Sequence, residues 1–184
     1  MRMKETDNTK VWTRKEIIHE ILEYSKVIIF AVAFSFLLNK TLITNAQVTS
    51  GSMENTVMTG SRVFVNRQAY LFQEPQRGDI ISFYYPDDGE TEYMKRIVGL
   101  PGEKIEGRDG AVYIDGVMLE EPYIREVSYE DFGPYEIPKD TYFKMGDHRT
   151  NSWDSRYWLN KFLHRDAIIG KAEFEYYPEI KSFH

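Results

Sequence analysis

Two residues in this chain have side chains that could form a hydrolytic pair. Ser52 lies in the sequence Ser50-Gly51-Ser52-Met53, just after an apolar stretch, and Lys95 lies downstream in Met94-Lys95-Arg96. A serine hydroxyl attacks a carbonyl carbon when a neighbouring base removes its proton, and a lysine amine can be that base. Taken singly, each residue has an ordinary interpretation, because serines are common in turns and lysines usually project into water.

A lysine can accept a proton only when its amine is uncharged. Its pKa in water is about 10.4, so the amine must be buried among apolar groups that lower this pKa. Apolar side chains flank Lys95 at Tyr93, Met94, Ile97 and Val98. They predict a suitable environment, although alternation along a strand sends some of them to the other face.

A third segment is dense in hydrogen-bonding side chains and runs from Gly146 to Arg156. Asp154 and Arg156 could form an ion pair that supports a loop there. His148 offers a second possible base, because histidine is the commonest general base in enzymes. A triad of His148, an aspartate and Ser52 is therefore an alternative that the spacing alone leaves open.

Composition limits the kind of protein that carries these residues. The 184 residues are 42% apolar and 15% aromatic, which indicates a packed core. The absence of cysteine excludes disulfides, zinc–thiolate sites and cysteine nucleophiles. Seven Lys/Arg and five Asp/Glu fall in residues 1–43, and the rest of the chain carries a formal charge of −8. That part has no basic stripe with interleaved aromatics, so nucleic-acid binding is unsupported.

An apolar run from Val27 to Leu38 has no charged residue. It is short for a membrane span, which needs about 20 residues, but Lys26 and Lys40 could snorkel from its two ends. A cleavable signal ending near Ala46 and a buried soluble helix are alternatives. We predict a retained transmembrane anchor over residues 27–44. The helical pattern of residues 11–26 indicates either a helix that continues into the anchor or an amphipathic segment at the membrane interface.

Orientation follows from the basic residues that precede this run. Six Lys/Arg lie before it, so the positive-inside rule places residues 1–26 in the cytoplasm. Residues 45–184 are then predicted to form an extracytoplasmic, β-rich catalytic domain.

The remainder of the chain has short β-type runs separated by turn signals. We predict a mostly β fold, an antiparallel sheet domain behind a single N-terminal transmembrane helix. Asp115-Gly116 is a strong hairpin signal, residues 120–140 read as an irregular loop, and a helical turn is expected over 165–169. The predicted strands are 62–66, 79–85, 92–98, 104–106, 111–114, 117–119, 141–145 and 170–177.

Together the three segments resemble type I signal peptidase, the membrane-bound Ser/Lys leader peptidase of bacteria. The resemblance rests on Ser50 to Met53, on Tyr93 to Gly102 and on Gly146 to Arg156, in this order behind an apolar segment, and it covers about residues 10–180. It implies a serine endopeptidase that removes signal peptides from exported preproteins without metal or cofactor. Its expected partners are signal peptides, the lipid bilayer and a nearby secretion translocon.

The resemblance also implies roles for individual residues. Ser52 is the nucleophile, Lys95 its general base, and Ser50 supplies a hydroxyl to the oxyanion hole. Ser152 orients the lysine amine, while Asp154 and Arg156 hold the last loop. The small side-chain pockets, which admit Ala-x-Ala sites, correspond to residues that could equally be ordinary core: Val48, Met53, Val57, Tyr93 and Met94.

The chain departs from the family pattern in several places. His148 stands where the family commonly has Asn, Asn55 where it has Pro, and Ser61 where an acidic residue is common. We therefore interpret His148 as structural. A self-cleaving repressor of the same Ser/Lys fold would need a DNA-binding domain, for which the first 45 residues have no room. An inactive peptide-binding protein is a further alternative, against which the presence of all the chemical residues argues.

Overall fold

The computed structural model describes residues 13–183, which divide into a helical unit up to Thr41 and a β-rich unit from Leu42. The helix α1 (Arg14–Thr41) begins with a capping box, in which the Thr13 backbone N–H donates to Glu16 Oε2 at 2.8 Å. Helix α1 runs through the apolar segment, as predicted. Among residues 13–183, however, no helix combines the length and apolar character needed to cross a bilayer, so the predicted span is not confirmed.

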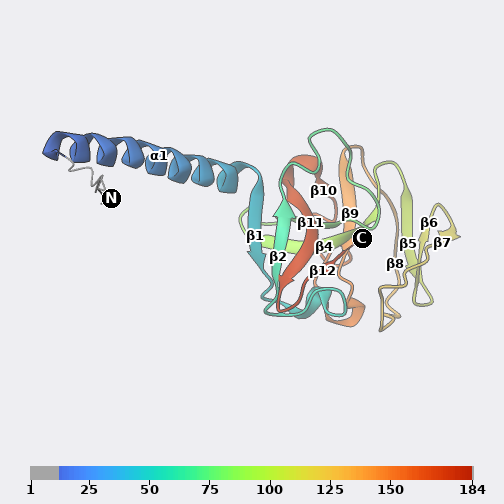
Figure 1. Ribbon diagram of the computed structural model, residues 1–184. Coiled ribbons are helices and arrows are strands. Elements are labelled where there is room, and N and C mark those ends of the chain that lie inside the picture. The colour runs from blue at the N-terminus through green and yellow to red at the C-terminus, as the bar shows by residue number, and fades with distance from the viewer. Residues whose placement is uncertain (1–12, 184) are drawn as a thin grey trace, which may run out of the picture. The chain divides into compact units, whose positions relative to one another are not determined.

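The β-rich unit is built from two antiparallel sheets (Figure 1). The larger has eight strands in the order β1-β2-β11-β3-β4-β9-β10, with β12 paired to β11, and the smaller has four in the order β7-β6-β5-β8. The strands of the larger sheet are β1 (Ile43–Gln47), β2 (Arg62–Asn66), β3 (Ile80–Tyr84), β4 (Glu92–Gly99), β9 (Thr141–Met145), β10 (Leu163–His164), β11 (Ile168–Tyr177) and β12 (Lys181–Ser182). Those of the smaller are β5 (Lys104–Arg108), β6 (Ala111–Ile114), β7 (Val117–Met118) and β8 (Phe132–Glu136).

The mostly antiparallel β fold is confirmed, and every predicted strand is present. The Asp115-Gly116 hairpin is confirmed as well, with φ of 50° and 80° at its two turn residues. Four strands were not predicted, namely β1, β8 and the two-residue strands β10 and β12. Strand β1 begins at Ile43, inside the predicted anchor. It was not predicted because its residues Ile43 to Gln47 lack an alternating pattern. Strand β8 lies inside the predicted irregular loop. It was not predicted because its central Gly133-Pro134 is typical of a turn.

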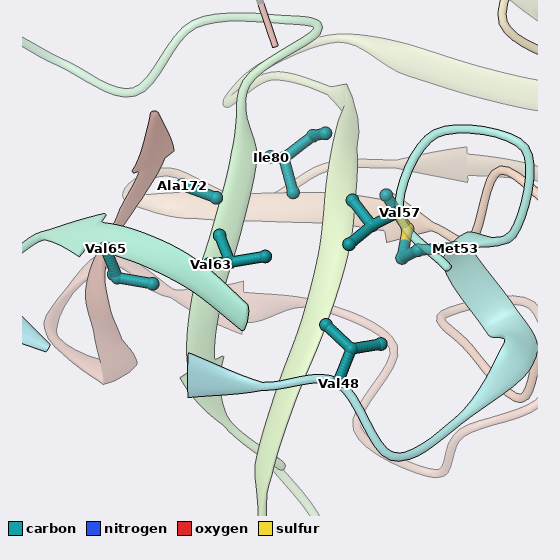
Figure 2. Close-up of a cluster of buried hydrophobic side chains, with 7 residues drawn as sticks. All are labelled: Val48, Met53, Val57, Val63, Val65, Ile80 and Ala172. Carbon is teal, nitrogen blue, oxygen red and sulfur yellow. The ribbon is translucent and has the colours of Figure 1, made fainter. Parts of the chain in front are cut away.

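The segment that carries Ser52 is fixed to the larger sheet by apolar packing (Figure 2). Val48, Met53 and Val57 flank Ser52 in the sequence and are buried against Val63 of β2 and Ile80 of β3. Ser52 itself lies in the short 3₁₀ helix η1 (Gly51–Met53), and the Val57 N–H donates to the Met53 carbonyl at 2.8 Å. Because this packing holds both ends of the segment, the position of Ser52 is set by the core.

Candidate active site

The side chains of Ser52 and Lys95 meet in the folded chain. Lys95 lies in β4, where it pairs with Ile81 of β3, and its Nζ donates a hydrogen bond to Ser52 Oγ. The lysine side chain is only 1% exposed. Burial is the largest influence on this amine and lowers the pKa of Lys95 to about 8, although the carboxylates of Asp154 and Asp147 act in the opposite direction. An amine with this pKa can take up a proton near neutral pH.

A second hydroxyl lies beside the Ser52 side chain. Ser50 Oγ is 3.3 Å from Ser52 Oγ, and the backbone of Ser50 is extended, with φ of −124° and ψ of 153°. A hydroxyl at this position can donate to an oxygen that develops negative charge when Ser52 attacks a carbonyl. The geometry is therefore compatible with the oxyanion role expected for Ser50.

His148 contacts the backbone of the Ser52 segment. The backbone N–H of His148 donates to the Ser52 carbonyl at 3.1 Å, and the ring Nδ1 lies 3.2 Å from the Gly51 carbonyl. Within residues 13–183, the hydrogen-bond partners of Ser52 Oγ are Lys95 and Ser50. The geometry thus favours the structural interpretation of His148 over the alternative triad.

Asp154 and Arg156 form a buried ion pair beneath the loop that follows β9. Arg156 donates to the Asp154 carboxylate through Nε at 2.8 Å and through Nη2 at 2.9 Å. Asp154 also accepts the Gly146 N–H at 3.0 Å, and Arg156 donates to the Arg149 carbonyl at 2.8 Å. This pair therefore joins both ends of the loop, as the sequence predicts.

Ser152 lies in the same loop and is buried, but its predicted contact with the lysine amine is not observed. Ser152 Oγ is a buried polar atom that has no hydrogen-bond partner among the residues the structure describes. A Cβ added to Gly146 would lie 2.3 Å from this oxygen, so the loop packs tightly here. The orienting role of Ser152 stays a prediction.

Sequence reasoning missed two further buried ion pairs next to the site. Arg96, which follows Lys95, donates to both Asp147 oxygens, at 2.9 and 2.6 Å. Arg149 donates to both Glu121 oxygens, at 2.9 and 2.5 Å. Arg96, Asp147 and Arg149 lie in the motifs already described, so the sequence indicated that they are near the site. Glu121 lies in the predicted irregular loop, where nothing in the sequence indicated an ion pair.

A cavity of about 370 Å³ opens beside Ser52. Its walls come from the chain that runs from β1 into η1, from the beginning of β4 with Thr91 before it, and from Ser82 of β3. Four of the five predicted pocket residues line it, namely Val48, Met53, Tyr93 and Met94. Val57 does not, because it is completely buried in the core behind Met53. Among residues 13–183, no group of three or more His, Asp or Glu side chains could hold a metal ion.

Two departures from the family pattern have a structural explanation. Asn55 has φ of 86°, a left-handed conformation that asparagine tolerates and that proline, with φ fixed near −65°, cannot adopt. Ser61 is buried and its hydroxyl donates to Glu175 of β11 at 2.6 Å. An acidic side chain on β11 therefore lies next to this position.

Comparison with known proteins places the chain in a family. Residues 21–177 match the family model described as signal peptidase, peptidase S26. Signal peptidase I T of Bacillus subtilis (strain 168) is 36% identical over 190 residues, which cover 96% of each chain. A signal peptidase I of Bacillus amyloliquefaciens is 37% identical over 85% of each chain. A signal peptidase I from Enterococcus faecalis V583, known from a crystal structure, is 35% identical in sequence. The matched region covers 54% of this chain and 97% of the Enterococcus chain, with a TM-score of 0.48. The chain therefore belongs to the type I signal peptidases, in the S26 family of peptidases.

Proposed function

We propose that this protein is a serine endopeptidase that removes signal peptides from exported preproteins, with Ser52 as nucleophile and Lys95 as general base. The observation that carries the proposal is the hydrogen bond from Lys95 Nζ to Ser52 Oγ inside a buried site. Burial lowers the pKa of this lysine to about 8, which makes the uncharged amine accessible at physiological pH.

The residues support an acyl-transfer mechanism in two stages. Uncharged Lys95 takes the proton of Ser52 Oγ as this oxygen attacks the carbonyl carbon, and the Ser50 hydroxyl stabilises the oxyanion that forms. The Lys95 ammonium then gives its proton to the leaving nitrogen, the peptide bond breaks, and an ester on Ser52 remains. In the second stage, Lys95 takes a proton from water as the water oxygen attacks the ester. The Lys95 ammonium then gives this proton to Ser52 Oγ as the ester bond breaks, which releases the acid and restores Ser52 and the uncharged amine.

The cavity beside Ser52 supports a preference for small side chains on the acyl side of the bond. An extended peptide can lie along the segment Asn45 to Ser50, with the early part of β4 on its other side. Met53 and Met94 line this space next to Ser52. Apolar walls this close to the nucleophile favour a small apolar side chain such as that of alanine. This is the pattern expected for Ala-x-Ala cleavage sites.

Incubation of the full-length protein in detergent micelles with a purified preprotein tests the function. We expect one cut directly after the Ala-x-Ala sequence, identified by the mass and N-terminal sequence of the mature product. The same preprotein with Leu in place of the alanine before the bond is the matched control. Its cleavage should fall at least about 100-fold, because a large side chain does not fit the pocket. Cleavage of neither substrate, or an equal rate for both, would contradict the proposal.

We further propose that α1 attaches the protein to the membrane, with the N-terminus in the cytoplasm and the β-rich unit outside. The uncharged run in α1 supports attachment, since its apolar side chains are exposed, for example Val27, Phe30 and Phe36. The six preceding basic residues support the orientation.

Cysteine labelling in whole cells distinguishes this topology from a peripheral one. The chain has no cysteine of its own, so Asn8→Cys and Lys139→Cys each provide a single reporter. A membrane-impermeant maleimide should label Lys139→Cys in intact cells and Asn8→Cys only after permeabilisation. The protein should also stay in the membrane pellet after alkaline carbonate extraction. Identical labelling of both variants would refute the single span, and release by carbonate would refute integral attachment.

A further inference from the structure

A second cavity, of about 690 Å³, also reaches Ser52. The two cavities share Ser50, Ser52 and Tyr93, so they adjoin at the nucleophile. Their other walls differ, because the second cavity is lined by the loop after β9 and by residues Ser128 and Glu130 of the segment before β8. A peptide that passes over Ser52 can therefore extend from one cavity into the other.

The position of Lys95 identifies which part of the substrate enters the second cavity. Lys95 lines this cavity and does not line the first. In the proposed mechanism, on which this inference rests, the Lys95 ammonium gives its proton to the nitrogen that leaves with the mature chain. The residues that follow the scissile bond should therefore occupy the second cavity.

The charged groups of this cavity are few. Among its lining residues, all within the described part of the chain, Lys95 is the only base and Glu130 the only acid. The form that reacts in the proposed mechanism has an uncharged Lys95, so in that form the cavity carries one negative charge, from Glu130. A single carboxylate next to a binding cleft favours a cationic side chain and disfavours an anionic one.

Glu130 is held in place by its surroundings. Tyr157 donates its hydroxyl to Glu130 Oε2, and the Tyr157 ring stacks on Trp153 with a centroid distance of 5.3 Å and an interplanar angle of 10°. The segment that contains Glu130 is tied to the loop after β9 through the buried Arg149–Glu121 ion pair. Trp153 is 56% exposed and lines the same cavity, so its indole is available to a guanidinium as well.

We propose that this cavity is a charge-selective subsite for the first residues of the mature chain, in which Glu130 favours lysine or arginine and disfavours glutamate. Trp153 adds a stacking surface, so arginine should be favoured at least as strongly as lysine. Because Glu130 is exposed to water, the preference of lysine over glutamine should be only about threefold to tenfold in kcat/KM. It should weaken as salt is added.

Matched peptide substrates test this selectivity with the full-length protein in detergent micelles. The peptides are identical up to the scissile bond and carry Lys, Arg, Gln or Glu at the first, second or third residue after it, one position at a time. At one or more positions we expect kcat/KM to follow the order Arg and Lys, then Gln, then Glu. The difference should arise mainly in KM and shrink between 50 mM and about 500 mM NaCl.

Two variants assign the effect to one carboxylate. In Glu130→Gln the ratio of Lys to Gln peptides should fall to about one, and in Glu130→Lys the Glu peptide should become the better substrate. Glu126→Gln is the matched control, since Glu126 lies on the same segment, accepts the Thr150 hydroxyl at 3.0 Å and does not line the cavity. This control should keep the wild-type preference.

The outcomes separate this inference from the proposed function. Equal kcat/KM for the Lys, Gln and Glu peptides at all three positions in the wild type would overturn the subsite, while cleavage itself continued. A preference that persists in Glu130→Gln would overturn the role of Glu130. If the wild type cleaved none of the peptides, including the Gln peptide, the proposed function would fail first.

Discussion

Replacing Lys95 with Met should lower kcat/KM by about 10³-fold to 10⁴-fold while leaving the fold intact. Methionine has a similar length and is apolar, so it fills a site that is already almost completely buried. In the proposed mechanism the substitution removes the group that accepts the Ser52 proton, and general base catalysis contributes a rate factor of about 10²-fold to 10⁴-fold. Peptide hydrolysis measures the loss, and near-ultraviolet circular dichroism with thermal unfolding checks the fold.

The protein contains a matched control for this substitution. Lys144 in β9 is also completely buried, its Nζ donates to the Lys161 carbonyl at 3.1 Å, and it lies 4.6 Å from the centroid of the Trp158 ring. Burial lowers the pKa of Lys144 well below its ordinary value too. Lys144→Met should keep kcat/KM within about threefold of the wild type, since this amine touches neither Ser52 nor the two cavities. Equal losses in both variants would contradict a catalytic role for Lys95.

The pH dependence of the wild type provides a second readout of the same residue. In the proposed mechanism the active form has an uncharged Lys95, so kcat/KM should rise with pH and level off above the lysine pKa. With a pKa of about 8, roughly one tenth of the lysine is uncharged at pH 7, against about 1 in 3,000 at an unshifted value of 10.5. We expect a rise of about eightfold to tenfold between pH 7 and pH 9. A profile that still climbs steeply above pH 10 would indicate a solvated lysine.

The parts of the fold that the sequence predicted well are those with strong local signals. Strand β2 has β-branched and aromatic residues between polar ends, and Asp115-Gly116 suits a two-residue turn whose backbone must be left-handed at both positions. Strand β1 was missed because it is stabilised by pairing with β2. Its five residues show no pattern from which this pairing could be predicted. For β8 the local signal was misleading, since Gly133-Pro134 lies inside a strand that pairs with β5.

The site divides in a similar way. Ser52, Lys95 and the Asp154–Arg156 pair lie in motifs whose combination resembles a known family, and that resemblance implied their roles, whereas each residue taken singly had an ordinary interpretation. The roles of Val57 and Glu130 depend on which side of a folded segment each faces, and spacing could not reveal that. Val57 turned out to be core rather than pocket wall, because the segment after Ser52 turns its apolar side chains towards β2 and β3. A binding role for Glu130 could be inferred only from the folded structure, in which Glu130 lines the second cavity.

Changing Asp154 to Asn should destabilise the β-rich unit by about 3–5 kcal/mol, because it leaves the Arg156 guanidinium buried without a counter-charge. Asp154 is completely buried, and its two oxygens together accept from Arg156 and from the Gly146 N–H. Asparagine keeps the size and can still accept from Gly146, so the loss measures the charge pair. Urea unfolding followed by tryptophan fluorescence gives the free energy of unfolding.

The fraction of Asp154→Asn that stays folded should also show a shifted pH profile. The Asp154 carboxylate raises the pKa of Lys95 and Arg156 lowers it, so removing the carboxylate should move the rise in kcat/KM to a lower pH. A merely structural loss would reduce the amount of active protein and leave this midpoint near 8. Asp140→Asn is the matched control, because Asp140 is exposed and has φ of 59°, which asparagine also adopts readily. Its stability and pH midpoint should equal those of the wild type, and an unchanged midpoint in Asp154→Asn would show that the pair does not act on the lysine.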